Sequence, residues 1–326
     1  MSTIDWQSLN VYVSGRFDGF KKEELNALIL GQGARVAGSF PSSNAILTSD
    51  PEGPKVAKAI EKGKTILQLD DLGGSLEGYL ERMQGALKAF QEQFADYRKK
   101  MVYHLAAGAP ADEALMTRVE EAIGFPLPDD LRTLMGQFNG LSMVGAEIKR
   151  KAEAPSFPET VLPYATLADM SHPLYAAAHD ATALSTIGIP SWSDIFLQPA
   201  KARLTGESCY GPKEKLKIGT LKVGATEFYE RLYPFDIFHP YHGAALYADP
   251  KDQTVKVIYA SDHWAALTSA HPVPLRIYME SLIAMVSHKG SFYEQRIIKP
   301  TSKTAWPTYI KNIHGGAYLF LETRGG

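Results

Sequence analysis

The first 73 residues alternate short apolar runs with amphipathic segments, a pattern typical of a parallel sheet flanked by helices. This pattern predicts strands at residues 9–13, 34–38, 45–49 and 65–69. Helices are predicted at residues 21–33 and 54–63, because a glycine ends each one and a proline stands in the first turn of the second. We therefore expect a compact α/β domain over residues 1–74.

A long amphipathic helix is predicted next, over residues 75–105, as a connection between two domains. Its apolar residues recur at alternating spacings of three and four, at Leu80, Met83, Leu87, Phe90, Phe94, Tyr97 and Met101. Such a seam packs either along a neighbouring domain of the same chain or against a second copy of itself. The aromatic residues favour the first arrangement, and a homodimer through residues 80–101 is the alternative.

The remainder, residues 106–326, is predicted to form an α+β domain with an antiparallel sheet. Two successive helices are expected near its start. The first ends at Gly124, and the second runs from Pro128 to Asn139-Gly140.

Later in this region, GAALYAD and TVKVIYA flank the turn PKDQ, which predicts an antiparallel hairpin. A further amphipathic helix is expected at residues 274–290. Between about residues 150 and 215 the chain is rich in proline and weakly periodic, so no element is predicted there.

Composition narrows the class of protein. The chain has 326 residues, 45% of them hydrophobic and 21% charged, enough for two domains with separate cores. The net charge of -2 gives no overall attraction to nucleic acid or to an acidic membrane. Cys209 is the single cysteine, which excludes an internal disulfide and fits a reducing compartment. With no basic-then-apolar leader and no long apolar run, we expect a cytoplasmic protein that does not enter a membrane.

The segment VYVSGRFDGF leaves the first predicted strand through Ser14-Gly15. One interpretation is turn chemistry, since glycine adopts backbone angles that other residues resist. The other is an anion site, since a hydroxyl and a free backbone amide at such a turn can bind a negative charge.

Four motifs occur here in a specific order: VSGRFDG at the first turn, GARV before the second strand, AILTS as the third, and KVAKAIEKGKTILQLDDL as the second helix and fourth strand. On these motifs, residues 7–73 resemble the BRCT domain, a phosphopeptide- and DNA-end-binding module. The family's phosphate-binding members use a Ser or Thr hydroxyl, the next glycine's amide and a lysine that begins the second helix. The matching residues are Ser14, Gly15 and Lys55, which alternatively serve only the fold.

Two departures from the BRCT pattern bear on affinity. The segment ILQLDDLGGS lacks the tryptophan that usually anchors the family's last helix, and only one copy of the domain is found where tight phosphopeptide binding usually takes two. Residues 1–73 hold eight Lys and Arg against nine Asp and Glu, so the domain lacks a strong field for DNA.

The C-terminal region resembles the SUKH superfamily, which includes the yeast cell-wall-assembly regulator and many bacterial immunity proteins. The resemblance rests on VEEAIGFPLPDDLRTLMGQFNGL at residues 119–141 and on the later block FDIFHPYHGAALYADPKDQTVKVIYASDHW. It implies a protein partner, such as a toxin or effector, that is held on an exposed face of the sheet. Aromatic anchors suit such an interface, and the candidates are Tyr229, Tyr233, Phe235, Tyr241 and Trp264, which alternatively form core.

Enzymatic interpretations are weaker. Asp236, His239 and His242 are the residue types that hold a divalent metal, but Pro240 disfavours a regular helix that would present both rings on one face. Cys209 has no assignable base. We therefore expect a non-enzymatic protein without cofactor or metal. The main hypothesis is an immunity-type or adaptor protein, and the alternative is a phosphate-reading adaptor that binds phosphopeptides or DNA ends.

Overall fold

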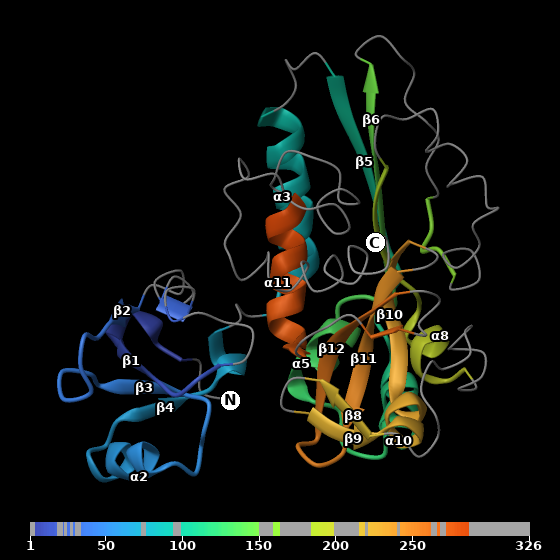
Figure 1. Ribbon diagram of the computed structural model, residues 1–326. Helices are drawn as coiled ribbons and strands as arrows, with labels where there is room; N and C mark the ends of the chain where they lie inside the picture. The colour runs from blue at the N-terminus through green and yellow to red at the C-terminus, as the bar shows by residue number, and fades with distance from the viewer. Residues whose placement is uncertain are drawn as a thin grey trace, which may run out of the picture. The chain divides into compact units, whose positions relative to one another are not determined.

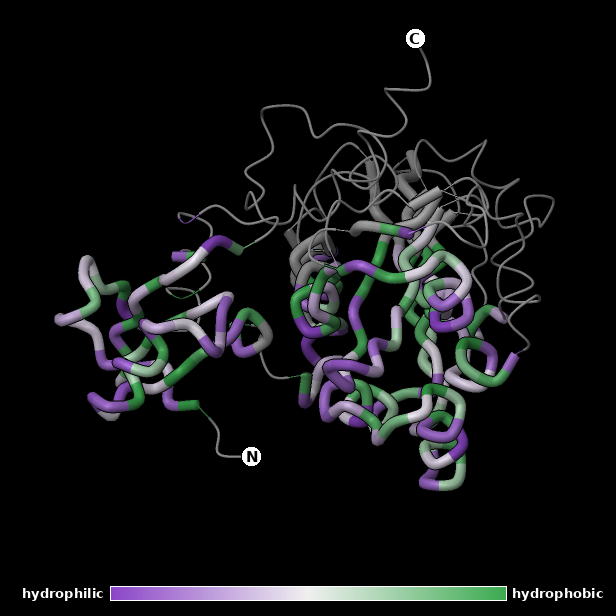
Figure 2. Tube along the Cα trace, turned by 60° about the horizontal axis from the view of Figure 1, so that its bottom comes forward, coloured by the Kyte–Doolittle hydropathy of each residue, from purple (hydrophilic) through white to green (hydrophobic). Residues whose placement is uncertain are grey.

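The structure is a computed structural model in which two compact units divide between Gly74 and Ser75. It describes residues 4–17, 22, 25–26, 29, 34–72, 76–93, 99–149, 159–163, 184–198, 215–218, 221–239, 242–261, 266–267 and 272–286. Figure 1 shows the elements of each unit, and along both units hydrophobic and hydrophilic stretches alternate (Figure 2).

The N-terminal unit is built on a four-stranded sheet with the order β2-β1-β3-β4. Its strands are β1 (Asn10–Ser14), β2 (Arg35–Val36), β3 (Ala45–Thr48) and β4 (Thr65–Leu67). Every pairing is parallel, as predicted. The helix α2 (Pro54–Glu61) lies against β3 and β4, and short 3-10 turns occupy Trp6–Ser8 and Leu69–Leu72.

Alternation along β1 divides the side chains between the two faces of this sheet. Val11 and Val13 are buried on one face, in a core cluster that includes Leu25 and Ile29 from the first helical segment. Of the helix predicted at residues 21–33, the described positions Lys22, Leu25, Asn26 and Ile29 are helical. The other face of β1 therefore carries Tyr12 and Ser14.

The single helix predicted over residues 75–105 is corrected by the structure. The helix α3 covers Tyr79–Gln93, and the strand β5 covers Lys99–Ala107. Met101, which was expected in the helical seam, pairs with Glu147 in the neighbouring strand. The segment KKMVYHLAA became a strand because β6 (Leu141–Lys149) offers it a partner along its whole length, which outweighs local propensity.

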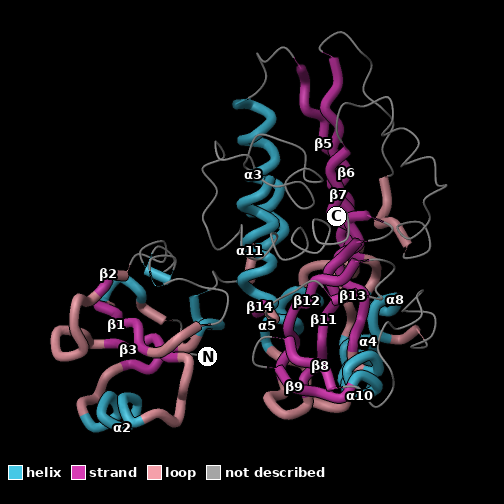
Figure 3. Tube along the Cα trace, in the orientation of Figure 1, coloured by secondary structure: helices cyan, strands magenta, loops and turns pink. Residues whose placement is uncertain are grey.

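The described part of the predicted seam lies inside the C-terminal unit. Met83 and Leu87 are buried, Leu80 is half-buried, and α3 packs beside α11 (Leu275–Val286) (Figure 3). The side chain of Phe90, together with Phe94 and Tyr97, lies outside the described residues. Over its described length, the apolar face considered for self-association thus packs against α11 of the same chain.

Polar contacts fix the helices of this unit to one another. The Tyr79 hydroxyl donates to the Met279 carbonyl at 3.2 Å, and Arg82 pairs with Glu280 at 2.6 Å. At the start of α11, Arg276 donates to Asp130 of the helix α5 (Asp129–Met135). These links make α3 part of the C-terminal unit.

The two helices predicted after residue 106 are present, with one corrected end. The helix α4 (Glu113–Ile123) stops at Gly124, whose φ of 84° is the left-handed conformation of a helix cap. The helix α5 (Asp129–Met135) ends at Gly136, earlier than the predicted Asn139-Gly140. The chain turns there because Phe138 is buried against Trp192.

The C-terminal unit contains antiparallel sheets, as predicted for its class. One has the order β5-β6-β7, with β7 at Leu184–Ile189. Another contains β10 (Leu232–His239), β11 (His242–Asp249), β12 (Thr254–Ser261), β13 (Ala266–Leu267) and β14 (Val273–Pro274). The predicted hairpin is β11-β12, closed at Asp249 and Thr254. A small ribbon of β8 (Lys215–Ile218) and β9 (Leu221–Gly224) precedes α10 (Ala225–Glu230).

The segment that the sequence left unassigned, about residues 150–215, supplies β7 and the short helix α8 (Trp192–Phe196) to this core. The Trp192 ring stacks on Phe138 at 5.8 Å and on Phe235 at 6.0 Å between ring centroids. Its ring nitrogen donates to the Phe138 carbonyl at 2.5 Å, so the one polar atom of the indole is satisfied. None of the helices in the described ranges is long and apolar enough to cross a membrane.

We expect Phe235→Ala to destabilise the C-terminal unit by about 3–5 kcal/mol, because the ring is fully buried between Trp192 and Tyr278. Chemical denaturation followed by tryptophan fluorescence measures this loss. Tyr229→Ala is the control, since that ring is only partly buried at the edge of its cluster, and a loss equal to that of Phe235→Ala would contradict the placement.

Burial first, and then the negative charges of Asp249 and Glu227, raise the pKa of Tyr247 to about 12. The folded pKa lies above the unfolded one, so this tyrosine's contribution to stability is intact below pH 10 and is lost as pH rises toward 12. Relative to Tyr247→Phe, we expect the free energy of unfolding to fall by about 1.4 kcal/mol by pH 11. Urea titrations of both proteins at pH 9 and pH 11 measure this change. If the difference in unfolding free energy between the two proteins were the same at both pH values, the burial of a neutral Tyr247 phenol would be contradicted.

Candidate functional site

The carboxyl ends of β1 and β3 meet at one edge of the N-terminal sheet. Ser14, the last residue of β1, pairs in register with Thr48, the last residue of β3. The chain then crosses from β3 to α2, which begins at Pro54. In open α/β sheets the region outside the carboxyl ends of the strands is where ligands bind, and Ser14, Gly15 and the start of α2 lie there together.

Gly15 is required by the close approach of two turns. Its φ is 97°, in the region that side chains resist, and a Cβ at this position would collide with the Ser49 hydroxyl. The turn interpretation of this glycine is therefore correct. The same conformation leaves the Gly15 amide unused, since it donates to no residue in the described part of the chain.

The Ser14 side chain also has hydrogen-bonding capacity to spare. The residue is 7% exposed, and its hydroxyl has no partner among the described residues. By contrast, the neighbouring Thr48 hydroxyl is engaged, because it accepts from the Asp50 amide at 3.1 Å. Of the hydroxyls of this matched pair, that of Ser14 is therefore the one available to a ligand.

The start of α2 supplies the positive end of a helix. Pro54 occupies the first turn and has no amide hydrogen, and the Lys55 amide donates to no described residue. One carboxylate is close by: Asp50 accepts from the Glu52 amide at 3.3 Å. The donor of that bond belongs to the turn before α2, so the bond does not use the Lys55 amide.

Lys55 lies on the same face of the sheet as Ser14. Its ammonium group is 5.5 Å from the centre of the Tyr12 ring, and Tyr12 and Ser14 point to the same side because they are two residues apart in a strand. No carboxylate of the described residues forms an ion pair with Lys55. Ser14, Gly15 and the start of α2 therefore lie at one end of the sheet, and the Lys55 ammonium group lies on the same face as Ser14.

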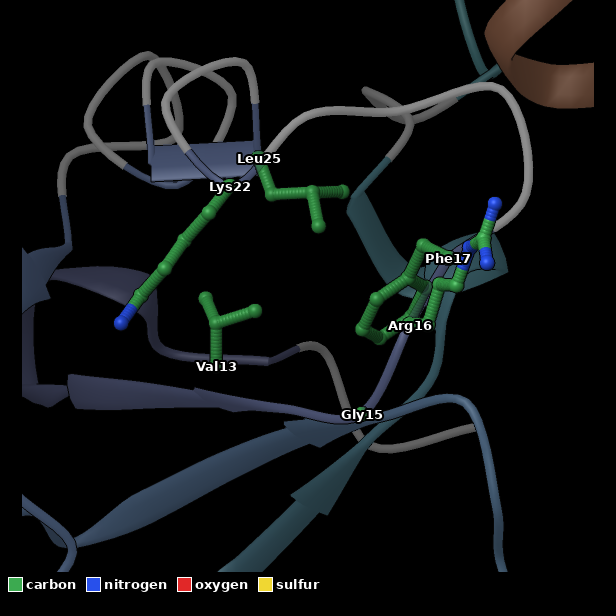
Figure 4. Close-up of a pocket in the computed structure, with 6 residues that line it drawn as sticks. All are labelled: Val13, Gly15, Arg16, Phe17, Lys22 and Leu25. Carbon is green, nitrogen blue, oxygen red and sulfur yellow. The ribbon is translucent and has the colours of Figure 1, made fainter.

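A cavity of about 210 Å³ lies beside this trio, on the opposite face of β1. It is lined by Val13, Gly15, Arg16, Phe17, Lys22 and Leu25, so only Gly15 is shared with the predicted site. Figure 4 shows the apolar side chains between the charged ends of Lys22 and Arg16, which lie on opposite sides. The cavity thus combines two cationic side chains, Arg16 and Lys22, with an apolar lining of Val13, Phe17 and Leu25.

Sequence reasoning missed two aromatic side chains of this domain, Tyr12 and Phe40, and their contacts with lysines. Lys22 also reaches the Tyr12 ring, at 5.9 Å, and Tyr12 meets Phe40 edge to face with centroids 6.0 Å apart. Phe40 in turn has Lys62 at 5.8 Å and Lys64 at 4.9 Å from its centre. The spacing of Lys55 and Lys62, about two helical turns apart, was the sequence signal for the lysines, whereas no pattern marks Phe40.

The aromatic residues predicted to anchor a partner are placed differently. Tyr233 and Phe235 are 3% and 0% exposed, so these two are core residues and not surface anchors. Tyr229 is partly buried against Phe228, and its role stays a prediction. Tyr241 and Trp264 lie outside the described residues.

Of the residues considered for a metal site, the structure describes the side chain of Asp236. Asp236 is fully buried, where it accepts from the Gly188 amide at 2.9 Å and from the Tyr278 hydroxyl at 2.6 Å. This carboxylate therefore joins β7, β10 and α11 inside the core. His239 and His242 pair across the β10-β11 turn, and their side chains, like Cys209, lie outside the described residues.

Comparison with known proteins supports the N-terminal assignment. Residues 7–76 match the family model of the BRCA1 C Terminus (BRCT) domain, and the parallel sheet described above lies within this range. A search of curated proteins found no match to the chain. BRCT domains are generally protein-binding modules without catalytic activity. The match does not extend to the C-terminal unit, where the resemblance to the SUKH superfamily stays a prediction.

We expect Gly15→Ala to destabilise the N-terminal unit by about 1–2 kcal/mol, because the new Cβ meets Ser49 and the backbone angle is unfavourable for alanine. Hydrogen exchange of peptides that cover β1 and β3 measures the loss. The control is Gly38→Ala, where a Cβ meets nothing within 4 Å. Equal protection in the two variants would contradict the close approach.

Proposed function

We propose that the chain is a non-enzymatic adaptor whose N-terminal domain binds a phosphorylated segment of a partner protein through Ser14, Gly15 and Lys55. One observation carries the proposal. A hydroxyl, a backbone amide and a lysine, each without a hydrogen-bond or ion-pair partner among the described residues, lie at the same end of a sheet that matches the BRCT family.

The chemistry of this trio suits a phosphate group. A phosphorylated side chain carries about -1.5 to -2 charges at neutral pH and three acceptor oxygens. The Ser14 hydroxyl and the Gly15 amide are directional donors, whereas Lys55 and the start of α2 contribute positive charge. All the donors are in place before binding, so a phosphate would not have to break existing hydrogen bonds of described residues.

Charge favours a peptide over a DNA end as the ligand. Residues 1–73 carry eight basic against nine acidic side chains, so the domain has no general attraction for a polyanion. A single phosphorylated residue needs only local charge. DNA ends remain the alternative ligand of the same trio.

The C-terminal unit has the second role in this proposal. An adaptor joins two partners, and this unit would supply the second protein-binding surface, the role that its resemblance to the SUKH superfamily implies. Tyr229, Tyr241 and Trp264 are the remaining candidate anchors for it. The specific identity of a toxin as the partner has no support from the N-terminal match.

The test is binding of the full chain to an oriented peptide library with a fixed phosphoserine or phosphothreonine, followed by fluorescence anisotropy with the selected peptide. We expect Lys55→Ala to weaken binding by about 10- to 100-fold, since it removes a charge-assisted contact, and Ser14→Ala to weaken it by about tenfold. Phosphatase treatment of the peptide should abolish binding.

Lys58→Ala is the matched control, because Lys58 is an exposed lysine of the same helix without a ring contact among those described. It should bind almost as the original chain does. If Lys58→Ala and Lys55→Ala weakened binding equally, or if the unphosphorylated peptide bound as well, the proposed site would be wrong.

A further inference from the structure

The basic and aromatic side chains beside the proposed site form a continuous cluster, which we call the lysine–aromatic ridge: Tyr12 and Phe40, with Lys22, Lys55, Lys62 and Lys64 around them. Each of the four ammonium groups is within 6 Å of one of the two ring centres. Cation–π contacts of energetic weight occur about once per 70–80 residues in proteins, so four within one small domain is a local concentration.

The ridge has no anionic partner in the described part of the chain. None of the described carboxylates pairs with any of its four lysines, although other lysines of the chain do form such pairs, as Lys256 does with Asp249 and Asp252. Bringing four ammonium groups together is electrostatically unfavourable unless a bound ligand supplies the negative counter-charges. The rings lower this cost only in part, since each such contact at an exposed site is weak.

The geometry of α2 sets the spacing of the charges. Lys55 and Lys62 are seven residues apart, which is close to two full turns, so their side chains leave the helix in nearly the same direction. The rise per residue separates them by about 10 Å along the helix axis. An extended peptide advances about 3.3 Å per residue, so three residues span that distance.

We infer that Lys62 and Lys64, with Phe40 between them, form a second anion subsite that binds an acidic or phosphorylated residue three positions from the phosphoresidue held by Ser14, Gly15 and Lys55. This inference rests on the proposed function and names the class of its ligand: a peptide with two negative charges in an i, i+3 relation. Glutamate and phosphoserine offer the same chemistry at that position.

The structure favours an acidic peptide over a nucleic acid strand here. Tyr12 and Phe40 are half-buried, and lysines already occupy positions over their rings, so the rings are not open platforms on which bases stack. The near-neutral charge of residues 1–73 also opposes an extended polyanion.

Lys62 is the residue to vary. Lys64 donates to the Ser43 carbonyl and contacts the Ser43 hydroxyl at 3.3 Å, so its loss would disturb the fold as well as the ridge. Lys62 caps the end of α2, is exposed, and has no side-chain hydrogen bond to a described residue. Lys62→Gln removes its charge and Lys62→Glu reverses it, and circular dichroism confirms that each variant folds.

The experiment measures binding of the full chain to five peptides. One has phosphoserine alone, three add one glutamate at three positions N-terminal, three positions C-terminal or six positions away, and the fifth has a second phosphoserine at the better of the two positions three residues away. We expect the glutamate on one side at three positions to strengthen binding about threefold, and a second phosphoserine there to do so about tenfold. Lys62→Gln should remove this gain and Lys62→Glu should invert it. Neither variant should alter binding of the phosphoserine-only peptide by more than about twofold, and Lys58→Glu should leave the gain in place.

The outcomes separate the two proposals. If the phosphoserine-only peptide binds but no glutamate position helps, or the gain survives Lys62→Glu, the second subsite is wrong and the proposed function stands. If no phosphorylated peptide binds, both are overturned. If a 5'-phosphorylated single-stranded oligonucleotide binds more tightly than every peptide and loses affinity in Lys62→Glu, the ridge is a nucleic-acid surface and the inference is also wrong.

Discussion

The N-terminal unit depends on the close approach of two turns, at Gly15 and Ser49. Parallel pairing places Ser14 opposite Thr48 at the ends of β1 and β3. The two turns that follow come so close that a Cβ at position 15 would collide with Ser49, so the residue there must be glycine. Glycine meets this need and, in doing so, leaves its amide and the neighbouring Ser14 hydroxyl without partners among the described residues. A constraint of folding therefore creates the donors of the proposed site, which explains why the structural and the functional interpretations of Ser14-Gly15 are compatible.

Charge is then concentrated along α2, the helix that follows. The domain as a whole is nearly neutral, yet α2 directs Lys55 and Lys62 along one line, and four ammonium groups lie within 6 Å of the ring centres of Tyr12 and Phe40. A local cluster in a neutral domain selects for short ligands with few charges. A long polyanion would meet the domain's acidic residues as well as the ridge. The proposed ligand, a phosphopeptide with one further acidic residue, fits this distribution of charge.

Local patterns were enough to predict the parallel sheet, α2 and the β11-β12 hairpin, because in each case the periodicity and the turn residues lie within a few positions. They were not enough for β5, whose helical spacing was overruled by nine pairings with β6. Trp192 was missed because its environment comes from Phe138 and Phe235, far apart in the sequence. The trio of the site followed from the family resemblance, whereas Phe40 stands in a loop where no pattern marks it. The burial of Tyr233 and Phe235 was equally invisible, since aromatic residues of strands serve cores and interfaces alike.

The central claim is that Ser14, Gly15 and Lys55 bind a phosphate. The most direct measurement is an amide NMR titration of the full chain, labelled with 15N at glycine and lysine, with N-acetyl-phosphoserine amide as the probe. The proposal predicts saturable shifts of the Gly15 and Lys55 amides, absent with N-acetylserine amide and absent for Gly15 in Lys55→Ala. Unmoved Gly15 and Lys55 signals, or equal shifts with the unphosphorylated probe, would contradict it.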